Sequence, residues 1–417
     1  MDNNNASQEK NFGFLKISVT SASGFSPVNN ARIQIANSGE PNVILEEVST
    51  DSSGNTPSIS LEAPPLEYSM APSENQPYSE YNIKIFAPDF DDEIITNIQI
   101  FSGEDAIQQV ILTSSQPSPI YNPIVIPGHT LWEFFPPKIA ESEIKPTNAS
   151  GEIVLSRVVV PETIVVHDGV PSDTSANNYY VPYLDYIKNV ASCEIYTTWP
   201  DETIRANILA IMSFTLNRVY TEWYRNKGYD FTITSSTAFD HKWTYNKTIY
   251  TKISQIADEL YGNFLSRPNV KQPILTQYCD GKRVSCPNWM TQWGSKTLGD
   301  DGLSAIQILR YYYGDDIYIN SAEIISGIPA SYPGYNLTIG TSGEPVITIQ
   351  EQLNRISKNY PALPTVDVDG IYGRDTASSV EKFQEIFNLP ESGIVDYPTW
   401  YKISQIYVGV TKIGENI

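Results

Sequence analysis

The change from strand-like to helix-like hydrophobic spacing is the feature that most constrains the fold. In residues 14–113, apolar and polar side chains alternate in short runs separated by Gly, Pro, Asn and Ser, as in strands that bury one face. Beyond residue 181, apolar side chains recur every three or four positions, as helices require. We therefore predict a multidomain α+β protein that begins with a β-sandwich. The clearest alternating runs are residues 14–19, 31–35 and 81–86.

Chain length and proline content divide the sequence further. A chain of 417 residues is too long for one core and predicts about three domains. A Pro-rich stretch without periodic spacing follows the sandwich and is typical of an extended linker, where exposed backbone can enter a protease cleft. The predicted parts are a β-sandwich (1–113), a linker with an activation cleavage site (114–160), a mixed α+β domain (161–325) and a small helical domain (335–411).

Charge and composition exclude several classes of partner. The net charge of −21 repels phosphate backbones and anionic lipids, so we expect neither nucleic acid nor a membrane surface as a partner. No apolar run approaches the roughly 18 residues of a membrane span, and the N-terminus shows no secretory signal, so we expect synthesis in a cytosol. Three cysteines are too few, and odd in number, for a disulfide scaffold.

One carboxylate falls on the apolar face of a predicted helix. Desolvation and the negative end of the helix dipole would both raise the pKa of Glu194. A carboxyl group that stays protonated near neutral pH is what a general acid for glycosidic cleavage requires. A solvated or capping role at a helix end is the alternative. Spacings of three, four and three place four residues on this face: Leu184, Ile187, Ala191 and Glu194.

The surroundings of Glu194 resemble the active-site motif of the SpoIID family of lytic transglycosylases. The resemblance rests on VPYLDYIKNVASCEI (181–195) and WPDETIRA (199–206), and on a later stretch with CPNWMTQWGSK (286–296) and DGLSAIQILRYYY (301–313). It implies that Glu194 is the catalytic residue. Asp240 is the best second carboxylate if hydrolysis occurs instead, with a turn role as its alternative. The candidate substrate-binding residues are Asp240, Tyr278, Gln292 and Trp293, although Gln292 and Trp293 fit packing roles equally well.

The chain departs from the SpoIID pattern at one segment. Where that family has His-Ser-x-Ser-Gly-Gly, this sequence has QYCDGKR (277–283), so no role of that histidine transfers. Some family members bind zinc, but Cys279 and Cys286 with a distant His241 fall short of the four ligands of a structural site. We therefore expect no metal and no other cofactor. For these two cysteines the sequence leaves two alternatives: a Cys279–Cys286 disulfide formed in an oxidising exterior, or two free thiols.

The last part of the sequence resembles the small helical repeat called peptidoglycan-binding type 1. The resemblance rests on DGIYGRDT (369–376), VEKFQ (380–384) and GIVDYPTW (393–400). The first of these predicts a tight loop in which glycines supply positive φ angles or allow close approach. No internal repeat stands out. The candidate wall-contacting residues are Asp369, Gly370, Tyr372 and Gly373.

Over nearly its whole length the chain is similar to clostridial spore cortex-lytic enzymes of the SleC type, for example at YIKNVAS (186–192) and SFTLNRV (213–219). This resemblance implies a lytic transglycosylase that cleaves MurNAc–GlcNAc bonds of spore cortex peptidoglycan to 1,6-anhydromuramic products during germination. It also implies synthesis in the mother-cell cytoplasm as an inactive precursor and later residence in the cortex or coat region. A Csp-type serine protease would cut near Val154, Leu155 and Ser156. The alternatives are an N-acetylmuramoyl-L-alanine amidase, alone or in addition, and a non-catalytic wall-binding protein.

Overall fold

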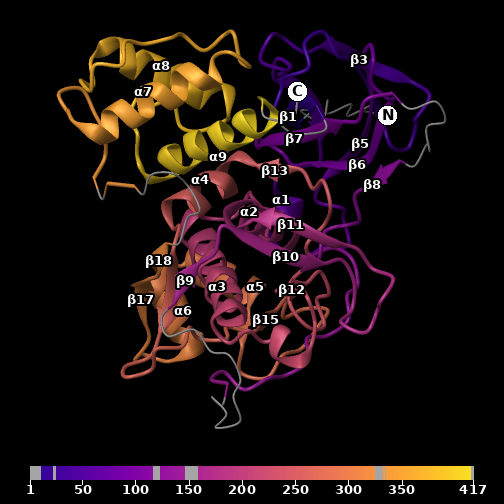
Figure 1. Cartoon of the computed structure of the whole chain (residues 1–417). Coiled ribbons are helices and arrows are strands. Elements are labelled where there is room, and N and C mark those ends of the chain that lie inside the picture. The colour runs from indigo at the N-terminus through magenta and orange to yellow at the C-terminus, as the bar shows by residue number, and fades with distance from the viewer. Residues whose placement is uncertain are drawn as a thin grey trace.

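The computed structural model describes residues 11–21, 25–115, 123–145, 158–324, 332–333 and 335–414. Figure 1 shows a β-rich N-terminal part, a mixed α/β part below it and a helical C-terminal part beside them. Within these described ranges, no helix is long and apolar enough to cross a bilayer. The predicted sequence of strands first and helices later is confirmed.

Two sheets form the N-terminal part. One has the strand order β3-β2-β5-β6-β8, and the other has the order β13-β7-β1-β4. Leu15, Ile17 and Val19 of β1 are fully buried while their neighbours are not, so the predicted alternation holds. The bounds are β1 (Asn11–Ser21), β2 (Arg32–Asn37), β3 (Ile44–Ser49), β4 (Ile59–Ala63), β5 (Ser79–Phe86), β6 (Glu93–Ile100), β7 (Asp105–Leu112) and β8 (Ile124–Val125), with a short helix α1 (Glu67–Met70) after β4.

The sheet that contains β1 is completed by a strand from the middle of the chain. Strand β13 (Ile249–Tyr250) pairs antiparallel with β7, and Ile249 lies opposite Ile107. One continuous cluster of buried apolar residues runs through both sheets and into the middle part. The sandwich and the middle part therefore share a core, which their separate sequence patterns do not reveal.

The middle part is built around α3 (Asp201–Tyr220), which contacts four other helices. Polar side chains on this helix are buried but paired. Ser213 donates to the carbonyl of Ile274 at 2.9 Å, and Asn217 donates to that of Pro273 at 2.7 Å. The other helices are α2 (Tyr183–Glu194), α4 (Thr251–Glu259), α5 (Gln292–Asp300) and α6 (Ala305–Tyr313). The strands are β9 (Val159–Val160), β10 (Thr163–His167), β11 (Asn178–Pro182), β12 (Ile233–Thr234), β14 (Asn263–Ser266), β15 (Tyr278–Cys279), β16 (Met290–Thr291), β17 (Tyr318–Ser321) and β18 (Glu323–Ile324).

The described part of the Pro-rich stretch, residues 123–145, packs against the rest of the protein. Ile126 and Leu131 belong to the main core. Farther along, the N–H of Leu275 donates to the carbonyl of Glu143 at 3.2 Å, so residues 138–145 run beside residues 272–277. An extended backbone suits proline, and neighbouring chain rather than water satisfies its polar groups. The prediction of a linker lying between domains is therefore wrong for this part. The predicted cleavage residues Val154, Leu155 and Ser156 lie outside the described residues.

The C-terminal part has its own apolar core and three helices. In Figure 1, α9 extends from this part toward the N-terminal sheets. This part contacts the sandwich at several places: Asn55 donates to the carbonyl of Ile386 at 3.1 Å, Asn359 donates to the hydroxyl of Ser26 at 3.4 Å, and Gly409 lies against the Phe25 ring. The helices are α7 (Glu344–Ile356), α8 (Arg374–Ile386) and α9 (Tyr397–Gly414).

The C-terminal part contains an internal repeat, contrary to the prediction that none is present. In each half, a buried glutamine accepts a hydrogen bond from a loop glycine that has positive φ. The distances are 2.9 Å for Gly370 to Gln350 and 2.8 Å for Gly393 to Gln384. The same glutamine then donates to a threonine in the first turn of the next helix, Thr376 or Thr399. The repeat is difficult to see in the sequence because DGIYGRDT and SGIVDYPT share few side chains.

Candidate active site

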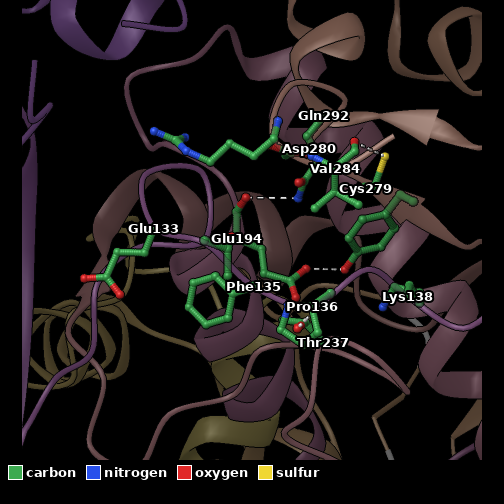
Figure 2. A pocket seen from close by; sticks show the side chains of 13 residues that line it. Glu133, Phe135, Pro136, Lys138, Glu194, Thr237, Cys279, Asp280, Val284 and Gln292 are labelled. Carbon is green, nitrogen blue, oxygen red and sulfur yellow. Dashed lines mark hydrogen bonds between the residues drawn. The ribbon is translucent and has the colours of Figure 1, made fainter. Parts of the chain in front are cut away.

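Glu194 is the last residue of α2, and its side chain is only 3% exposed. The backbone N–H of Lys242 donates to its Oε1 at 2.6 Å, and the hydroxyl of Tyr278 donates to its Oε2. Figure 2 shows the carboxyl group in a recess with Pro136 and Thr237 beside it. The predicted burial of Glu194 on an apolar helix face is confirmed.

The surroundings of Glu194 disfavour its charged form. Burial raises the pKa of Glu194, while the Lys138 ammonium and the hydrogen bonds from Tyr278 and Lys242 oppose this effect only in part. The pKa therefore stays above the usual value for a glutamate. A carboxyl group with this property holds its proton closer to neutral pH, as a general acid must.

The cavity at the Glu194 carboxyl group is small. Its volume is about 60 Å³, whereas pockets that bind organic ligands usually measure about 300–1,000 Å³. A few water molecules fit, but a pair of sugar rings does not. The lining comes from several separate stretches of chain: Thr130, Glu133, Phe135, Pro136 and Lys138 from the Pro-rich segment; Glu194; Thr237; and Tyr278, Cys279, Asp280, Arg283, Val284 and Gln292.

The segment that closes this cavity is residues 129–145, which we call the strap. Phe135 and Pro136 of the strap lie beside Glu194 (Figure 2), and Lys138 lines the same cavity. The ammonium of Lys138 donates to the backbone carbonyl of Asp240 and lies 5.2 Å from the centre of the Tyr278 ring. The sequence does not predict Lys138 as part of the site, because a lysine among prolines is typical of a solvated linker.

The first end of the strap is attached to the C-terminus of α2. The N–H of Thr130 donates to the carbonyl of Cys193 at 3.2 Å, and Nε2 of His129 donates to that of Ile195 at 3.3 Å. Carbonyls at a helix end have no partner within the helix, so the strap supplies one. Burial lowers the pKa of His129, which keeps the ring neutral for this role.

The second end of the strap is held by a buried ionic network. Glu141 pairs with Arg218 at 2.5 Å and also with Lys145. Arg218 in turn donates from Nε to Asp240 at 2.7 Å. The strap is therefore fixed on both sides of Glu194 by polar groups that have given up water to make these contacts.

Asp240 does not reach the cavity through its side chain. It is fully buried, and its carboxylate accepts from Arg218, from the hydroxyl of Tyr224 at 2.6 Å and from the N–H of Thr234 at 2.9 Å. With every partner supplied by the protein, it has no oxygen free for a sugar or a water nucleophile. The prediction that Asp240 binds substrate is therefore wrong, and the alternative of a structural role in a turn fits its N–H bond to Ser236.

The two neighbours Gln292 and Trp293 have different positions. Gln292 lines the cavity, and its side-chain amide donates to the carbonyl of Glu194 at 3.0 Å. Trp293 packs against Trp199, with ring centres 5.0 Å apart, and does not line the cavity. Packing is thus the correct alternative for Trp293. Gln292 supports the backbone that carries Glu194.

A disulfide lies beside the cavity. Cys279 and Cys286 are bonded, which decides between the two alternatives that the sequence left open. The bond closes a loop in which Asp280 accepts from the N–H groups of Arg283 at 2.7 Å and Val284 at 2.8 Å. Because Cys279 follows Tyr278 directly in β15, this loop fixes the strand that carries the tyrosine.

Two contributors to the site had no signal in the sequence. Lys242 acts on Glu194 through its backbone N–H, which any residue type supplies. Asp280 orders the disulfide loop, but an aspartate before a glycine is typical of turns in general. In the described ranges, no three His, Cys, Asp or Glu side chains are grouped as a metal site would need.

The candidate wall-contacting residues of the C-terminal part separate into two groups. Tyr372 is fully buried, and its hydroxyl donates to the carbonyl of Gly393 at 3.0 Å, so it supports the fold and does not face the wall. Asp369 is exposed but accepts from the N–H of Ile371 at 2.9 Å. Gly370 has the predicted positive φ of +70°, whereas Gly373 has an ordinary φ of −87°.

Comparison with known proteins identifies the C-terminal part. Residues 342–403 match the family model described as a putative peptidoglycan binding domain. The C-terminal part is thus a peptidoglycan-binding type of domain, which associates the chain with the cell wall. No curated protein sequence matches the chain.

Three solved structures have local likenesses to the chain. The SleB N-terminal domain is 30% identical over 18% of this chain and 99% of its own, with a TM-score of 0.17. The Bacillus anthracis TIE protein is 20% identical over 25% of this chain and 17% of its own, with a TM-score of 0.18. GBS52, the minor pilin of Streptococcus agalactiae, is 11% identical over 27% of this chain and 49% of its own, with a TM-score of 0.19. At such TM-scores these likenesses carry no argument about the whole fold.

Proposed function

We propose that this protein is a latent peptidoglycan-cleaving enzyme of the spore cortex, a lytic transglycosylase that uses Glu194 as its acid and base. The observation that carries the proposal is the buried carboxyl group of Glu194, whose pKa is raised and which accepts two ordered hydrogen bonds. The peptidoglycan-binding domain at residues 342–403 supports the polymer as substrate. The sequence resemblance to SpoIID transglycosylases supports the reaction type.

In the proposed reaction, protonated Glu194 gives its proton to the oxygen that links muramic acid to the next sugar, and the bond from C1 to that oxygen breaks. The resulting carboxylate then takes the proton of the C6 hydroxyl as O6 bonds to C1. The product is a 1,6-anhydro sugar, and the acid is regenerated. No water is consumed, so one carboxyl group suffices where ordinary glycosidases use a pair.

We infer that the strap keeps this enzyme inactive. A cavity of about 60 Å³ admits no sugar pair, and Phe135, Pro136 and Lys138 occupy the space beside the carboxyl group. Lys138 also lowers the pKa of Glu194, which works against its role as an acid. Cleavage of the chain after the strap, by a Csp-type protease, would give the strap a free end from which to leave.

The test compares cortex fragments digested by the full chain, by protein cut between residues 145 and 158, and by the cut Glu194→Gln variant. Cut wild-type protein should release anhydromuramic ends, and the other two should not. Cut Glu259→Gln is the matched control, since Glu259 is a glutamate on the surface of the same part. Mass spectrometry separates the alternatives, because free lactyl groups identify an amidase. Activity retained by Glu194→Gln contradicts the assignment, and equal activity before and after cutting contradicts latency.

A further inference from the structure

A second and larger cavity lies where the three parts of the protein meet. Its volume is about 480 Å³, within the range of pockets that bind organic ligands. It is lined by the N-terminal half of α2, by β7 and β13 of the sandwich and by residues of α9. We call it the junction groove. Glu194 lies at the other end of α2, so the groove is separate from the candidate active site.

Aromatic rings form one wall of the junction groove. Tyr180, Trp243 and Tyr245 line it, and Tyr180 and Tyr245 are 75% and 45% exposed. Behind them, the ring of Tyr179 is stacked on Tyr245 at 5.0 Å and lies 5.2 Å from Trp243. Tyr245 is thus an exposed ring held in place by other rings, which offers a ligand a fixed apolar face. Flat apolar ligand surfaces, such as the faces of pyranose rings, suit such a wall.

Two buried polar atoms of the groove residues have no partner. Nε1 of Trp243 and the hydroxyl of Tyr183 are both inaccessible and make no hydrogen bond within the described chain. The indole N–H can only donate, so it requires an acceptor oxygen. Most buried polar groups in proteins are paired, so these two atoms are exceptions, and both are covered by the side chains around them.

The charges of the groove cancel. Three acidic and three basic residues line it, although the whole chain has a net charge of −21. They are Glu162, Asp185 and Asp258, and Lys188, Lys247 and Lys402. Lys188 and Asp258 are paired at 2.7 Å, which removes one ion of each sign from reach. The groove therefore favours an uncharged ligand with hydroxyl and amide groups over an anionic peptide or a nucleic acid.

We propose that the junction groove binds a stretch of β-1,4-linked N-acetylhexosamine glycan, apart from the candidate active site. The pyranose faces stack on the exposed rings of Tyr180 and Tyr245. That the glycan comes from a peptidoglycan strand rests on the proposed function and on the peptidoglycan-binding domain, because the α8–α9 loop and α9 also line the groove. The groove would hold the polymer between the wall-binding domain and the helix that carries Glu194.

One short segment connects the two sites. Lys242 donates its N–H to Glu194, the next residue Trp243 lines the junction groove, and the carbonyl of Thr244 accepts from Asn189 of α2 at 2.9 Å. A glycan in the groove would therefore contact the same segment whose Lys242 N–H donates to the carboxyl group of Glu194.

The test uses full-length Glu194→Gln protein labelled with 5-fluorotryptophan and chitotetraose, an uncharged β-1,4-linked tetramer of N-acetylglucosamine. Fluorine NMR follows the Trp243 resonance, assigned with Trp243→Phe, during titration. The resonance should shift saturably, and Tyr180→Ala/Tyr245→Ala should raise the Kd by about tenfold or more. Tyr311→Ala removes a ring that is 69% exposed and lies outside the groove, so the Kd should stay as before.

The proposal is overturned if the Trp243 resonance does not move at saturating chitotetraose, or if the double variant binds as tightly as the Tyr311→Ala control. It is also overturned if a muramoyl stem peptide, but not chitotetraose, moves the resonance. Because Glu194→Gln is used throughout, these results do not depend on catalysis. Failure here therefore leaves the role of Glu194 intact, and failure of the Glu194 digestion test leaves the groove intact.

Discussion

The hydroxyl of Tyr278 donates a hydrogen bond to Oε2 of Glu194, from a residue 84 positions later in the sequence. The tyrosine is buried on β15, and the disulfide between Cys279 and Cys286 begins at the next residue. Glu194, at the end of α2, is thus held by the N–H of Lys242, the hydroxyl of Tyr278 and the side-chain amide of Gln292. The strap then covers this assembly. Each of these relationships makes an expectation that an experiment can check.

Replacing Tyr278 by Phe removes one hydrogen bond that lowers the pKa of Glu194, so this pKa should rise. A general acid works while protonated. The alkaline limb of the activity profile of the cut enzyme should therefore move to higher pH, together with a lower maximal rate because the carboxyl group is less well held. The measurement is the pH dependence of anhydro-sugar release. Tyr311→Phe is the control, and an unmoved limb in Tyr278→Phe would contradict the expectation.

Replacing Lys138 by Met should raise the pKa of Glu194 in the full chain, because the buried ammonium is the strongest of the influences that lower it. Carbon-13 NMR of labelled glutamate carboxyl groups measures this pKa, with Glu194→Gln to assign the signal. Lys252→Met, which removes a lysine of α4 that pairs with Glu104, should leave the pKa of Glu194 unchanged. A pKa of Glu194 that is the same in Lys138→Met and wild type would show that the strap does not reach the carboxyl group.

Glu141→Gln should loosen the strap. Burial raises the pKa of Glu141, but hydrogen bonds and charge from Arg218 and Lys145 outweigh this, so the pKa is lowered overall. A lowered pKa in the folded state means that the stabilisation is present above the ordinary pKa and is lost as pH falls through the folded one. We expect about 1.5–3 kcal/mol less stability at pH 7 and a weaker acid dependence. Urea unfolding at several pH values tests this; Glu143→Gln, whose partner Arg267 is more exposed, should change less.

Removing the disulfide should weaken the hold on Tyr278. Closing a loop with a sequence separation of seven stabilises by about 2–3 kcal/mol in the chain-entropy model. Cys279→Ser/Cys286→Ser should therefore unfold at a lower temperature and have lower activity after cutting. Reductant should bring the wild type to the level of the double variant and leave the variant unchanged. Insensitivity of both the wild-type melting temperature and its activity to reductant would refute this expectation.

Gly370→Ala should destabilise the C-terminal domain. The glycine has φ of +70°, and an added Cβ would come within 2.9 Å of the Ile347 side chain. A left-handed backbone disfavours residues with a Cβ by about 1–2 kcal/mol. Gly373→Ala is the matched control, since its φ is ordinary and nothing lies within 4 Å of the added atom. Retention of peptidoglycan binding on heating separates the two variants, and equal loss in both would contradict the argument.

Local pattern was sufficient for part of this protein. Alternation at residues 14–19 and the spacing around Glu194 depend on neighbours a few positions apart, and a strand or helix face follows from them directly. The burial of Glu194 was predictable for the same reason. The glycine turn at Gly370 was also predictable, because few other residues adopt that backbone conformation.

Other features depend on contacts between residues distant in the sequence. From the sequence, Asp240 is a candidate second carboxylate. In the structure its carboxylate is occupied by hydrogen bonds from Arg218, Tyr224 and Thr234. The strap resembled a linker because nothing within it shows that residues 272–277 lie alongside.

The sequence by itself therefore determined the strands at residues 14–19, 31–35 and 81–86, and the helix face on which Glu194 is buried. Only the tertiary structure decided what lies against that carboxyl group, that Cys279 meets Cys286 and that three parts enclose the junction groove. The physical reason is that hydrophobic periodicity records how one segment meets water, whereas a site is made where several segments exclude water together.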